Sequence, residues 1–566
     1  MWGGRSGTGE CAKRCRLAPC GDSNRTRNSR CFKILAIIGS GPTATYALKH
    51  LTAEPGSLDI LVLEAGAKAG PGMPYARAHN GPQMLANIAS IEIPPLTRTL
   101  VEWLESQSDA QLARLEVERD AISERAFYPR IVLGAYFAAE FKALCAQART
   151  LGHRVSVETG QRVLDIVPRI GGFELKLEDA QGVRWCHADG VIVATGHRHK
   201  ASKGNQGPVY RSPYPTRALR LGRQHSAGII GSSLSAIDAV IALAQRHGSF
   251  ETEGRRLVYR PKGEPIALTM LSRKGLLPEA DFYYPIPEAP LEIFSDDAVL
   301  ELVQHGKTGL LARAVALFKR QLMADDPGFL ATLGLKRLTP EGFCRAYFEM
   351  RGQQEALVHA KANLAEAKRN HRKRHTVKWR YTLMRAHEVF STLVPYLNTP
   401  DLQRFHKTLK PVFADAYGCV PHASIARLLA LADAGCLGVV ALSNRKVVRK
   451  GSGFGLKRTE LAFETLIDAR GQQAMTVSEL GFKRLAEAML DADPYRKNRH
   501  SRAHNDYRLP LKPRLSRNIF CLALPAMLKR YPFAQGLVSS DHFGHAVAQS
   551  LLAAHAETAR PLVVAG

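Results

Sequence analysis

Hydrophobic residues gather in short runs that alternate with longer stretches of helical spacing. The apolar run at 32–39 is followed by a turn, a helix-type stretch at 44–54 and a second apolar run at 58–66. A strand, a tight turn, a helix and a second strand within about thirty residues form a βαβ unit, which implies parallel strands. The pattern therefore predicts a Rossmann-type domain that begins near residue 32.

The same reading applies to the rest of the chain. Helical spacing is found at 98–108, 131–151, 296–415 and 541–556, and strand patterns at 153–178, 190–196, 266–273, 435–442, 461–471 and 518–524. A second strand, turn and helix occupy 226–248. Alternating strands and helices of this kind favour an α/β fold with parallel sheets and a helical insertion.

The first turn carries the glycine pattern of a phosphate-binding loop. It reads Gly39, Ser40, Gly41, Pro42, Thr43, Ala44. Gly39 permits the tight bend, Gly41 lets backbone N–H groups approach a pyrophosphate, and Ala44 lets the helix pack on the strand. Glu64 ends the second strand, where a carboxylate accepts hydrogen bonds from ribose hydroxyls. The alternative for Glu64 is an ordinary carboxylate at the surface end of a strand.

The second turn is a weaker version of the first. It reads Gly231, Ser232, Ser233, Leu234, Ser235, Ala236, so serine replaces the second glycine. Serine still permits close approach and adds a hydroxyl for a phosphate. Ser272 and Arg273 end the next strand, where a hydroxyl and a cation suit the 2′-phosphate of NADPH. The alternative is a surface pair formed by Arg273 and Lys274, and an insertion near 249–265 explains the long separation from Gly231.

Positive charge is concentrated rather than spread over the chain. The formal net charge is +27, and basic residues cluster at 1–30, 368–380 and 495–517. Such segments focus anionic cofactors, attract nucleic acid, or simply form solvated faces. Few aromatic residues accompany them, so stacking platforms for bases are poor, which argues against a nucleic-acid partner.

Cysteine usage and hydropathy restrict the class further. Ten cysteines are too few for a disulfide scaffold, and none form a C-x-x-C pair. The spacings of Cys11, Cys15, Cys20 and Cys31 depart from paired metal sites, so no metal is expected. No uninterrupted apolar stretch approaches the roughly 20 residues of a membrane span. We expect a cytoplasmic protein with mostly reduced, buried cysteines and no membrane span.

Several longer motifs indicate a family. They are GSGPTATY at 39–46, the loop at 70–95 that contains GPGMPYARAHNG, ATGH at 194–197, GSSLSAIDA at 231–239, LPEADFYYPIP at 277–287, HTVKWRY at 375–381, IDARGQ at 467–472 and PFAQGL at 532–537. Together they closely resemble the YdhS-like FAD/NAD(P)-binding proteins of bacteria over roughly residues 33–555. More distantly the chain resembles FAD-dependent urate hydroxylases and aspartate N-monooxygenases, which share the fold and reduce their flavin with a nicotinamide cofactor.

The resemblance implies residues that contact FAD beyond the first turn. Met73, Pro74 and Tyr75 would lie beside the isoalloxazine ring or ribityl chain, residues 85–87, ending on Asn87, would pass along the flavin, and Thr195 and Gly196 would close the first half of the domain. Gln535 and Gly536 would cap the pyrimidine edge. For the loop at 72–75 the alternative is a buried plug. The late Gly-Asp pair that holds the ribityl chain in many flavoproteins is absent at 522–525.

We therefore predict an α/β protein with two Rossmann-like dinucleotide-binding domains, in which an FAD domain is interrupted by an NAD(P) domain and a helical insertion. The expected parts are a disordered basic tail at 1–30, FAD-binding segments at 31–205 and 416–566, an NAD(P) domain at 206–295 and the helical insertion at 296–415. The expected cofactors are FAD and NADPH or NADH.

The expected function is that of an NAD(P)H-using flavoprotein, most readily a monooxygenase of a small polar or anionic substrate. The absence of a C-x-x-C pair argues against a disulfide reductase. An alternative of another class is a flavin-containing redox sensor whose basic segments hold nucleic acid or a partner. Because the flavin carries the chemistry, the sequence identifies no catalytic side chain and leaves the substrate and the oligomeric state open.

Overall fold

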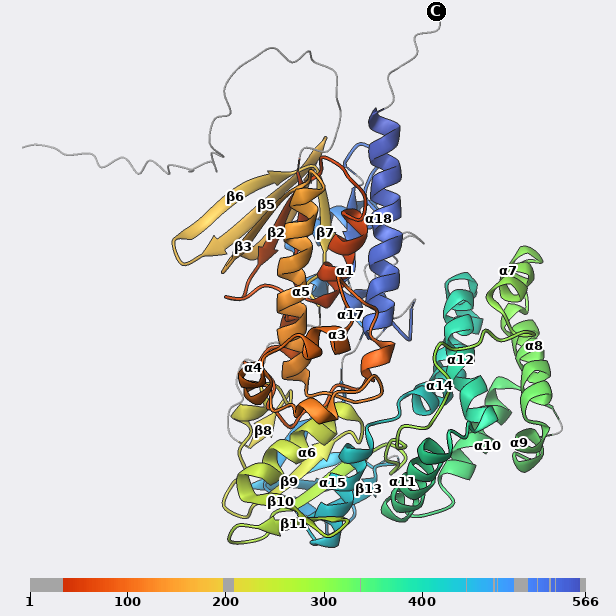
Figure 1. The fold of residues 1–566 in the computed structure, drawn as a ribbon. Helices are drawn as coiled ribbons and strands as arrows, with labels where there is room; N and C mark the ends of the chain where they lie inside the picture. The colour runs from red at the N-terminus through yellow and green to blue at the C-terminus, as the bar shows by residue number, and fades with distance from the viewer. Residues whose placement is uncertain are drawn as a thin grey trace, which may run out of the picture.

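The structure is a computed structural model that describes residues 34–196, 208–335, 337–443, 445–471, 474–475, 477–492, 507–516, 518–528, 531–534 and 536–559. The predicted tail at 1–30 with its cysteines, Gln535 and the first part of the basic segment at 495–517 lie outside these residues. Figure 1 shows two α/β lobes, one above the other, with a group of helices beside them.

The first lobe is built on a five-stranded parallel sheet in the order β18-β7-β1-β2-β3. Its strands are β1 (Leu35–Ile38), β2 (Asp59–Glu64), β3 (Arg154–Thr159), β7 (Gly190–Val193) and β18 (Ile519–Cys521). All four residues of β1 are buried, because helices and a second sheet cover both faces of the sheet. The edge strand β18 comes from the C-terminal part of the chain, so this domain is interrupted.

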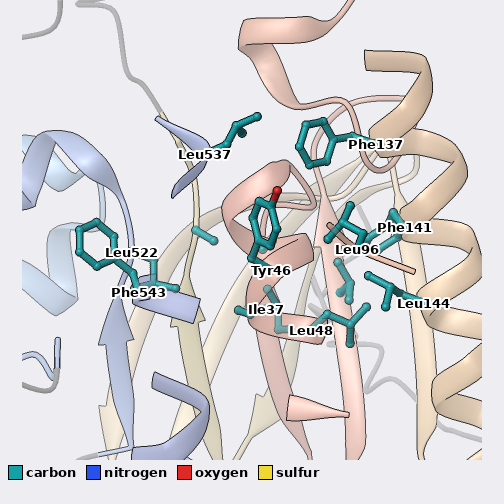
Figure 2. Close-up of a cluster of buried hydrophobic side chains, with 14 of the residues drawn as sticks. Ile37, Tyr46, Leu48, Leu96, Phe137, Phe141, Leu144, Leu522, Leu537 and Phe543 are labelled. Atoms are coloured by element: carbon teal, nitrogen blue, oxygen red, sulfur yellow. The ribbon is translucent and has the colours of Figure 1, made fainter. Parts of the chain in front are cut away.

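Three long helices pack on one face of this sheet. They are α1 (Pro42–Leu51), α5 (Arg130–Thr150) and α18 (Leu537–Ala559). Figure 2 shows Tyr46 of α1 between side chains of α5, such as Phe137, and the C-terminal residues Leu522 and Phe543. By length and composition alone α5 could cross a bilayer, but 61% of its apolar window is buried inside the protein, which is the pattern of a core helix.

The opposite face of the first sheet is covered by an antiparallel three-stranded sheet. This sheet consists of β4 (Arg162–Arg169), β5 (Gly172–Asp179) and β6 (Gly182–Ala188), and α16 (Lys483–Ala492) packs against it. The connections of the lobe hold α2 (Gly72–Tyr75), α3 (Leu100–Glu105), α4 (Asp109–Arg114) and α17 (Leu524–Met527).

The second lobe contains a second parallel sheet, in the order β13-β12-β9-β17-β8. Its strands are β8 (Val209–Tyr210), β9 (Ser226–Ile230), β12 (Ala267–Ser272), β13 (Leu437–Ala441) and β17 (Thr465–Asp468). Helices α6 (Leu234–His247) and α15 (His422–Asp433) cover it. A hairpin of β10 (Gly248–Glu253) and β11 (Arg256–Pro261) is the insertion expected before β12. A small sheet of β14 (Val447–Lys450), β15 (Gly453–Leu456) and β16 (Ala462–Phe463) follows β13.

The predicted boundary at residue 416 is wrong in one respect. Strands β13 and β17 were expected in the returning FAD-binding segment, but they pair with β12 and β9 of the second sheet. The second domain is therefore completed after the helical insertion, and the first sheet is rejoined only at β18. A short apolar run carries the same pattern in either parallel sheet, so its partner is decided by the tertiary fold.

The helical part lies between the two halves of the second domain. It contains α7 (Asp296–Gln304), α8 (Leu310–Asp325), α9 (Pro327–Thr332), α10 (Pro340–Arg351), α11 (Ala356–Lys373), α12 (Lys378–Leu393), α13 (Thr399–Lys407) and α14 (Leu409–Tyr417). Phenylalanines such as Phe318, Phe390 and Phe413 form its core. Helix α11 instead packs its apolar face on the second domain, so it joins the two parts.

The six cysteines in the described residues are free thiols, four of them buried. The architecture confirms the predicted α/β class, with two Rossmann-like domains and a helical insertion.

Candidate dinucleotide-binding site

The first glycine turn has the geometry that close phosphate approach requires. Gly39 has φ +98°, and a Cβ there would lie 2.5 Å from the carbonyl oxygen of Ala194. Gly41 is the N-cap of α1 and provides no side-chain cap. The N–H groups of the first helical turn therefore remain available for a pyrophosphate, and the helix dipole favours its charge.

A second glycine brings the loop at 70–75 against this turn. A Cβ on Gly41 would lie 3.1 Å from Cα of Gly72, and Gly72 itself has φ +63°. Gly70 packs equally closely on α5, where a Cβ would lie 2.6 Å from Cα of Ala138. The backbones of the turn and the loop therefore meet without side chains between them. Backbone groups exposed in this way suit the binding of an extended diphosphate.

Glu64 lies beside the turn and already has partners. One carboxylate oxygen, Oε2, accepts hydrogen bonds from the backbone N–H of Ser40 at 3.1 Å and from its hydroxyl at 2.6 Å. The other, Oε1, accepts from Gly66 N–H at 2.6 Å. The hydroxyl of Ser40 also accepts from the N–H of Gly70 at 3.1 Å. These bonds hold the carboxylate at the end of β2, and its contact with a ribose stays a prediction.

The segment at 73–75 is held by one amide. Nδ2 of Asn80 lies 3.5 Å, 2.9 Å and 3.1 Å from the carbonyl oxygens of Met73, Pro74 and Ala76. The ring of Tyr75 stacks on Phe137, with centroids 5.7 Å apart. One face of Tyr75 is therefore a packing contact, as the alternative of a buried plug requires, and the turn is rigid.

Asn87 carries an orphaned polar atom. Its Oδ1 is buried and has no hydrogen-bond partner within the described part of the chain. The neighbouring backbone is fixed, because Ala86 N–H donates to the carbonyl of Tyr128 at 2.9 Å. A buried acceptor without a donor costs about 1–3 kcal/mol. A donor from a bound cofactor would remove this cost, so the residues present fit FAD.

The remaining predicted FAD contacts come from distant segments. Thr195 is exposed and Gly196, with φ +67°, is half-buried at the end of β7, directly after Ala194. Gly536 is exposed and is brought toward the turn by a hydrogen bond between the hydroxyls of Thr43 and Ser540, 3.0 Å apart. Gln535 lies outside the described residues.

The second glycine turn repeats the geometry of the first. Gly231 has φ +123°, and a Cβ there would lie 2.8 Å from the carbonyl oxygen of Ala469. Ser232 donates its hydroxyl to the carbonyl of Leu276 at 2.6 Å, so this hydroxyl is a structural contact. Ser233 is exposed and is the N-cap of α6, with no side-chain cap bond. Residues 467–471 therefore lie beside the second turn in the same way that residues 192–196 lie beside the first turn.

The predicted 2′-phosphate contacts lie at the end of β12. Ser272 Oγ accepts from Gly275 N–H at 3.0 Å, and Arg273 is exposed. Lys274 is the neighbouring cation, and its Nζ lies 3.0 Å from the ring centroid of Phe348. Arg273 therefore remains available to an anion, while Lys274 is engaged with the helical part.

A network between the domains was missed by the sequence reading. Arg130, at the start of α5, forms an ion pair with Asp238 of α6 at 2.6 Å, and both side chains are largely buried. Tyr214 donates its hydroxyl to the same carboxylate at 2.5 Å, and Arg130 reaches Asn80 Oδ1 at 3.5 Å. Burial raises the pKa of Tyr214 to about 12. The network runs from the second domain to the loop beside the first turn, and no local pattern marks it.

Within the described residues no group of three or more His, Cys, Asp or Glu side chains could hold a metal ion. The two sheets, each with an uncapped helix after a glycine turn, define a two-dinucleotide flavoprotein. A model of FAD-NAD(P)-binding domains matches residues 36–198. The protein thus binds FAD and a nicotinamide cofactor, the redox pair of an oxidoreductase.

The comparisons also identify the family. A model of the YdhS-like middle domain matches residues 295–417. The chain is 36% identical over 527 residues to YdhS of Escherichia coli strain K12, covering 92% of this chain and 98% of that protein. The chain belongs to the YdhS-like family.

Solved structures resemble the chain more remotely. An ornithine N-hydroxylase of Kutzneria sp. 744 matches with TM-score 0.47 and 13% identity, covering 92% of this chain and 99% of the other. Ornithine hydroxylase from Pseudomonas aeruginosa matches with TM-score 0.48 and 14% identity, covering 93% and 99%.

Proposed function

We propose that the protein is a monooxygenase that uses NAD(P)H and FAD to hydroxylate a small polar or anionic substrate. The observation that carries the proposal is the pair of uncapped helix N-termini behind Gly39 and Gly231, in a chain without a C-x-x-C pair. Two dinucleotide sites supply a hydride donor and a flavin. Because the chain has no C-x-x-C dithiol to relay the electrons, we take oxygen together with an organic substrate as the acceptor in this proposal.

In this proposal each domain has one task. The first domain, formed by the described residues within 34–196 and 477–559, holds FAD through the turn at 39–44, the loop at 70–75 and the buried side-chain oxygen of Asn87. The second, at 208–295 and 422–471, holds the nicotinamide cofactor through the turn at 231–236 and Arg273. FAD supplies the redox chemistry when bound, and the chain binds, orients and excludes water. Because the six described cysteines form no disulfide with one another and four of them are buried, we propose the cytoplasm as its location.

The redox-sensor alternative is less well supported by the basic segment at 368–380. Arg380 of this segment is 10% exposed and lies 3.3 Å from Glu279, so part of the charge is structural. Arg372 and Arg374 are exposed. A sensor that holds nucleic acid would bind duplex DNA with an affinity that falls steeply with salt. Lack of binding at low salt would exclude it.

The test is a turnover assay under isotopically labelled oxygen. Purified, FAD-loaded protein is mixed with NADPH and a panel of candidates that includes urate and α-amino acids, and NADPH oxidation and oxygen uptake are recorded. A monooxygenase shows substrate-stimulated oxidation and a product that carries one labelled oxygen atom. Stimulated NADPH oxidation with an unlabelled product would replace the proposal by an oxidase or a reductase.

A further inference from the structure

The helical part meets the first domain at Phe533, in the segment that leads into α18. Phe533 is buried in the phenylalanine core of the helical part, although Tyr531 and Ala534 on either side of it pack in the core of the first domain. The start of α18 lies beside the first turn, because the hydroxyls of Ser540 and Thr43 are hydrogen-bonded. This junction therefore brings side chains of the helical part close to the domain assigned to FAD.

Helix α14 turns one stripe of side chains toward this junction. Lys410, Phe413 and Tyr417 follow one another at spacings of three and four residues, which places them on one face of the helix. The ring centroids of Phe413 and Tyr417 lie 6.2 Å and 5.7 Å from that of Phe533. Lys410 therefore lies about one helical turn further along the face that contacts the first domain.

Lys410 is a cation without a counter-charge. Its side chain is half-buried, and within the described part of the chain it forms neither a hydrogen bond nor an ion pair. Burial lowers the pKa of its ammonium group, and no charged neighbour offsets this effect. A bound anion would compensate for the hydration that the ammonium group has lost, so its surroundings favour one.

His387 and Tyr417 add an acceptor and a donor on the same side of the helical part. The imidazole of His387, on α12, stacks on the ring of Tyr417 with centroids 4.5 Å apart. Nδ1 of His387 contacts the carbonyl oxygen of Met384, which assigns the ring proton to Nδ1 and leaves the lone pair on Nε2. Among the described residues neither this Nε2 nor the hydroxyl of Tyr417 has a hydrogen-bond partner. Both groups are therefore available to a ligand.

Lys410, Tyr417 and His387 lie in a recess rather than on an open face. Each is half-buried, so solvent reaches it. Burial nevertheless lowers the pKa of His387 to about 4 and raises the pKa of Tyr417 to about 12. At neutral pH the imidazole is uncharged and the phenol keeps its proton. Arg385 also lies near His387 but is paired with Glu388 at 2.6 Å, so Lys410 supplies the unmatched charge.

We propose that this recess binds a small acid that carries an O–H or N–H group beside its carboxylate, such as a hydroxy acid. The carboxylate pairs with the ammonium group of Lys410 and accepts the hydroxyl of Tyr417, and the O–H or N–H group donates to Nε2 of His387. A neutral alcohol would leave the ammonium group unmatched, and a simple carboxylate would leave the acceptor unused. The role of this ligand as the substrate rests on the proposed function, whereas its binding does not.

The experiment measures binding to the oxidised, FAD-loaded full chain by calorimetry at neutral pH. The probes are glycolate, L-lactate and L-malate, and the controls are acetate and ethylene glycol, which each lack one of the two groups. At least one hydroxy acid should bind roughly tenfold tighter than either control. Lys410→Met should weaken it roughly tenfold, and Lys410→Arg should restore part of the loss. Tyr417→Phe and His387→Phe, which keep the ring stack, should each weaken it by a smaller factor. The exposed change Lys407→Gln should leave it unchanged.

Stability separates a ligand site from a structural role. A lysine that held the fold together through a contact would lower the urea midpoint when it is replaced. Lys410 has no such contact, so Lys410→Met should leave the midpoint unchanged or raise it while it weakens anion binding. A lower midpoint with unchanged binding would assign Lys410 to the fold and overturn the proposal. The same holds if the parent binds no hydroxy acid more tightly than acetate.

One further outcome would reassign the lysine to the flavin. If Lys410→Met changes the flavin reduction potential and leaves hydroxy-acid binding unchanged, the ammonium group serves the cofactor and the proposal is rejected. Failure of the monooxygenase assay is distinguishable from these results, because binding is measured without NADPH. A hydroxy acid that binds without stimulating NADPH oxidation leaves the anion site in place and removes its role as the substrate site.

Discussion

Gly39 and Gly231 are the residues on which the two cofactor sites depend most directly. Each has a positive φ, and each packs against the backbone carbonyl that follows a neighbouring parallel strand, at Ala194 and Ala469. A Cβ at either position would contact a carbonyl oxygen at less than 3.0 Å, so the backbone would have to move. The movement would displace the helix N-terminus that is to receive the phosphates.

We therefore predict separate losses from two matched substitutions. Gly39→Ala should lower the amount of FAD retained after purification at least tenfold, read from flavin absorbance per mole of protein. Gly231→Ala should retain FAD but slow its anaerobic reduction by NADPH at least tenfold. The control is Gly171→Ala, which has φ +83° but nothing within 4 Å of the added Cβ. Equal loss of FAD in the Gly39 and Gly231 variants would contradict the assignment of the two turns.

At the scale of elements, three helices of the insertion converge on one buried carboxylate, and a fourth is linked to it through Arg351. Glu279 is 4% exposed and lies 3.5 Å from Arg351 of α10, 3.1 Å from His359 of α11 and 3.3 Å from Arg380 of α12. Arg351 continues the network to Asp415 of α14 at 2.8 Å. Burial alone would raise the pKa of Glu279, but Arg380, His359 and Arg351 outweigh it and lower the pKa to about 2.

Removing this carboxylate should strongly destabilise the helical part. Glu279→Gln removes the carboxylate that two buried guanidinium groups share, and leaves Arg351 with Asp415 and Arg380 with Glu366 as their remaining partners. The expected cost is about 3 kcal/mol, measured as a lower urea midpoint at pH 7. Because the folded pKa is depressed, the stabilisation is complete above pH 4.5 and is lost as the pH falls toward 2. The matched control is Glu366→Gln, since Glu366 is 35% exposed and lies 3.5 Å from Arg380. A similar shift in both variants would argue against the central role of Glu279.

The same network explains why a basic run need not be a binding surface. Arg372 and Arg374 are exposed to solvent, whereas Arg380 of the same run is buried and forms an ion pair with Glu279. Charge counted along the sequence does not separate these cases, because the basic run spans the end of α11, a turn at Arg374 and the start of α12, so its residues lie on two different helices.

At the scale of the whole molecule, the two dinucleotide domains are joined by buried polar contacts. Arg130 connects α5 of the first domain to Asp238 of α6, and through Asn80 to the carbonyls at 73–76. Arg427 of α15 donates to the carbonyl of Gln83 at 2.9 Å, which adds a second tie. Such ties set how the second domain is oriented toward the loop beside the first turn.

Weakening the ion pair between Arg130 and Asp238 should impair electron transfer from NADPH to the flavin more than it impairs the binding of either cofactor. We predict that Arg130→Gln retains FAD but slows anaerobic flavin reduction by NADPH at least tenfold, as measured by stopped-flow absorbance. The reason is that the nicotinamide domain loses its orientation while both turns stay intact. The control is Arg154→Gln, whose ion pair with Asp59 is at the surface, with Arg154 78% exposed. An unchanged reduction rate in Arg130→Gln would limit the network to a structural role.

Much of the fold could be predicted from local sequence patterns. The assignment of two strands to the wrong sheet has an identifiable physical cause. The βαβ units at 34–64 and 226–272, the helical stretch at 296–415 and the interruption of the first domain were predicted from periodicity and turn residues. The strands at 437–441 and 465–468 were assigned to the wrong sheet. The apolar sequence of a buried parallel strand indicates that the strand is buried, but it does not indicate which strand lies next to it.

The sequence by itself determined the cofactor class and the two glycine turns, because a tight bend and close phosphate approach demand particular residues at adjacent positions. The tertiary structure alone decided which strands complete the second sheet, that Arg130 meets Asp238, and that Glu279 lies between Arg351 and Arg380. These are contacts between residues far apart in the chain, and their chemistry appears only when the fold brings the side chains together.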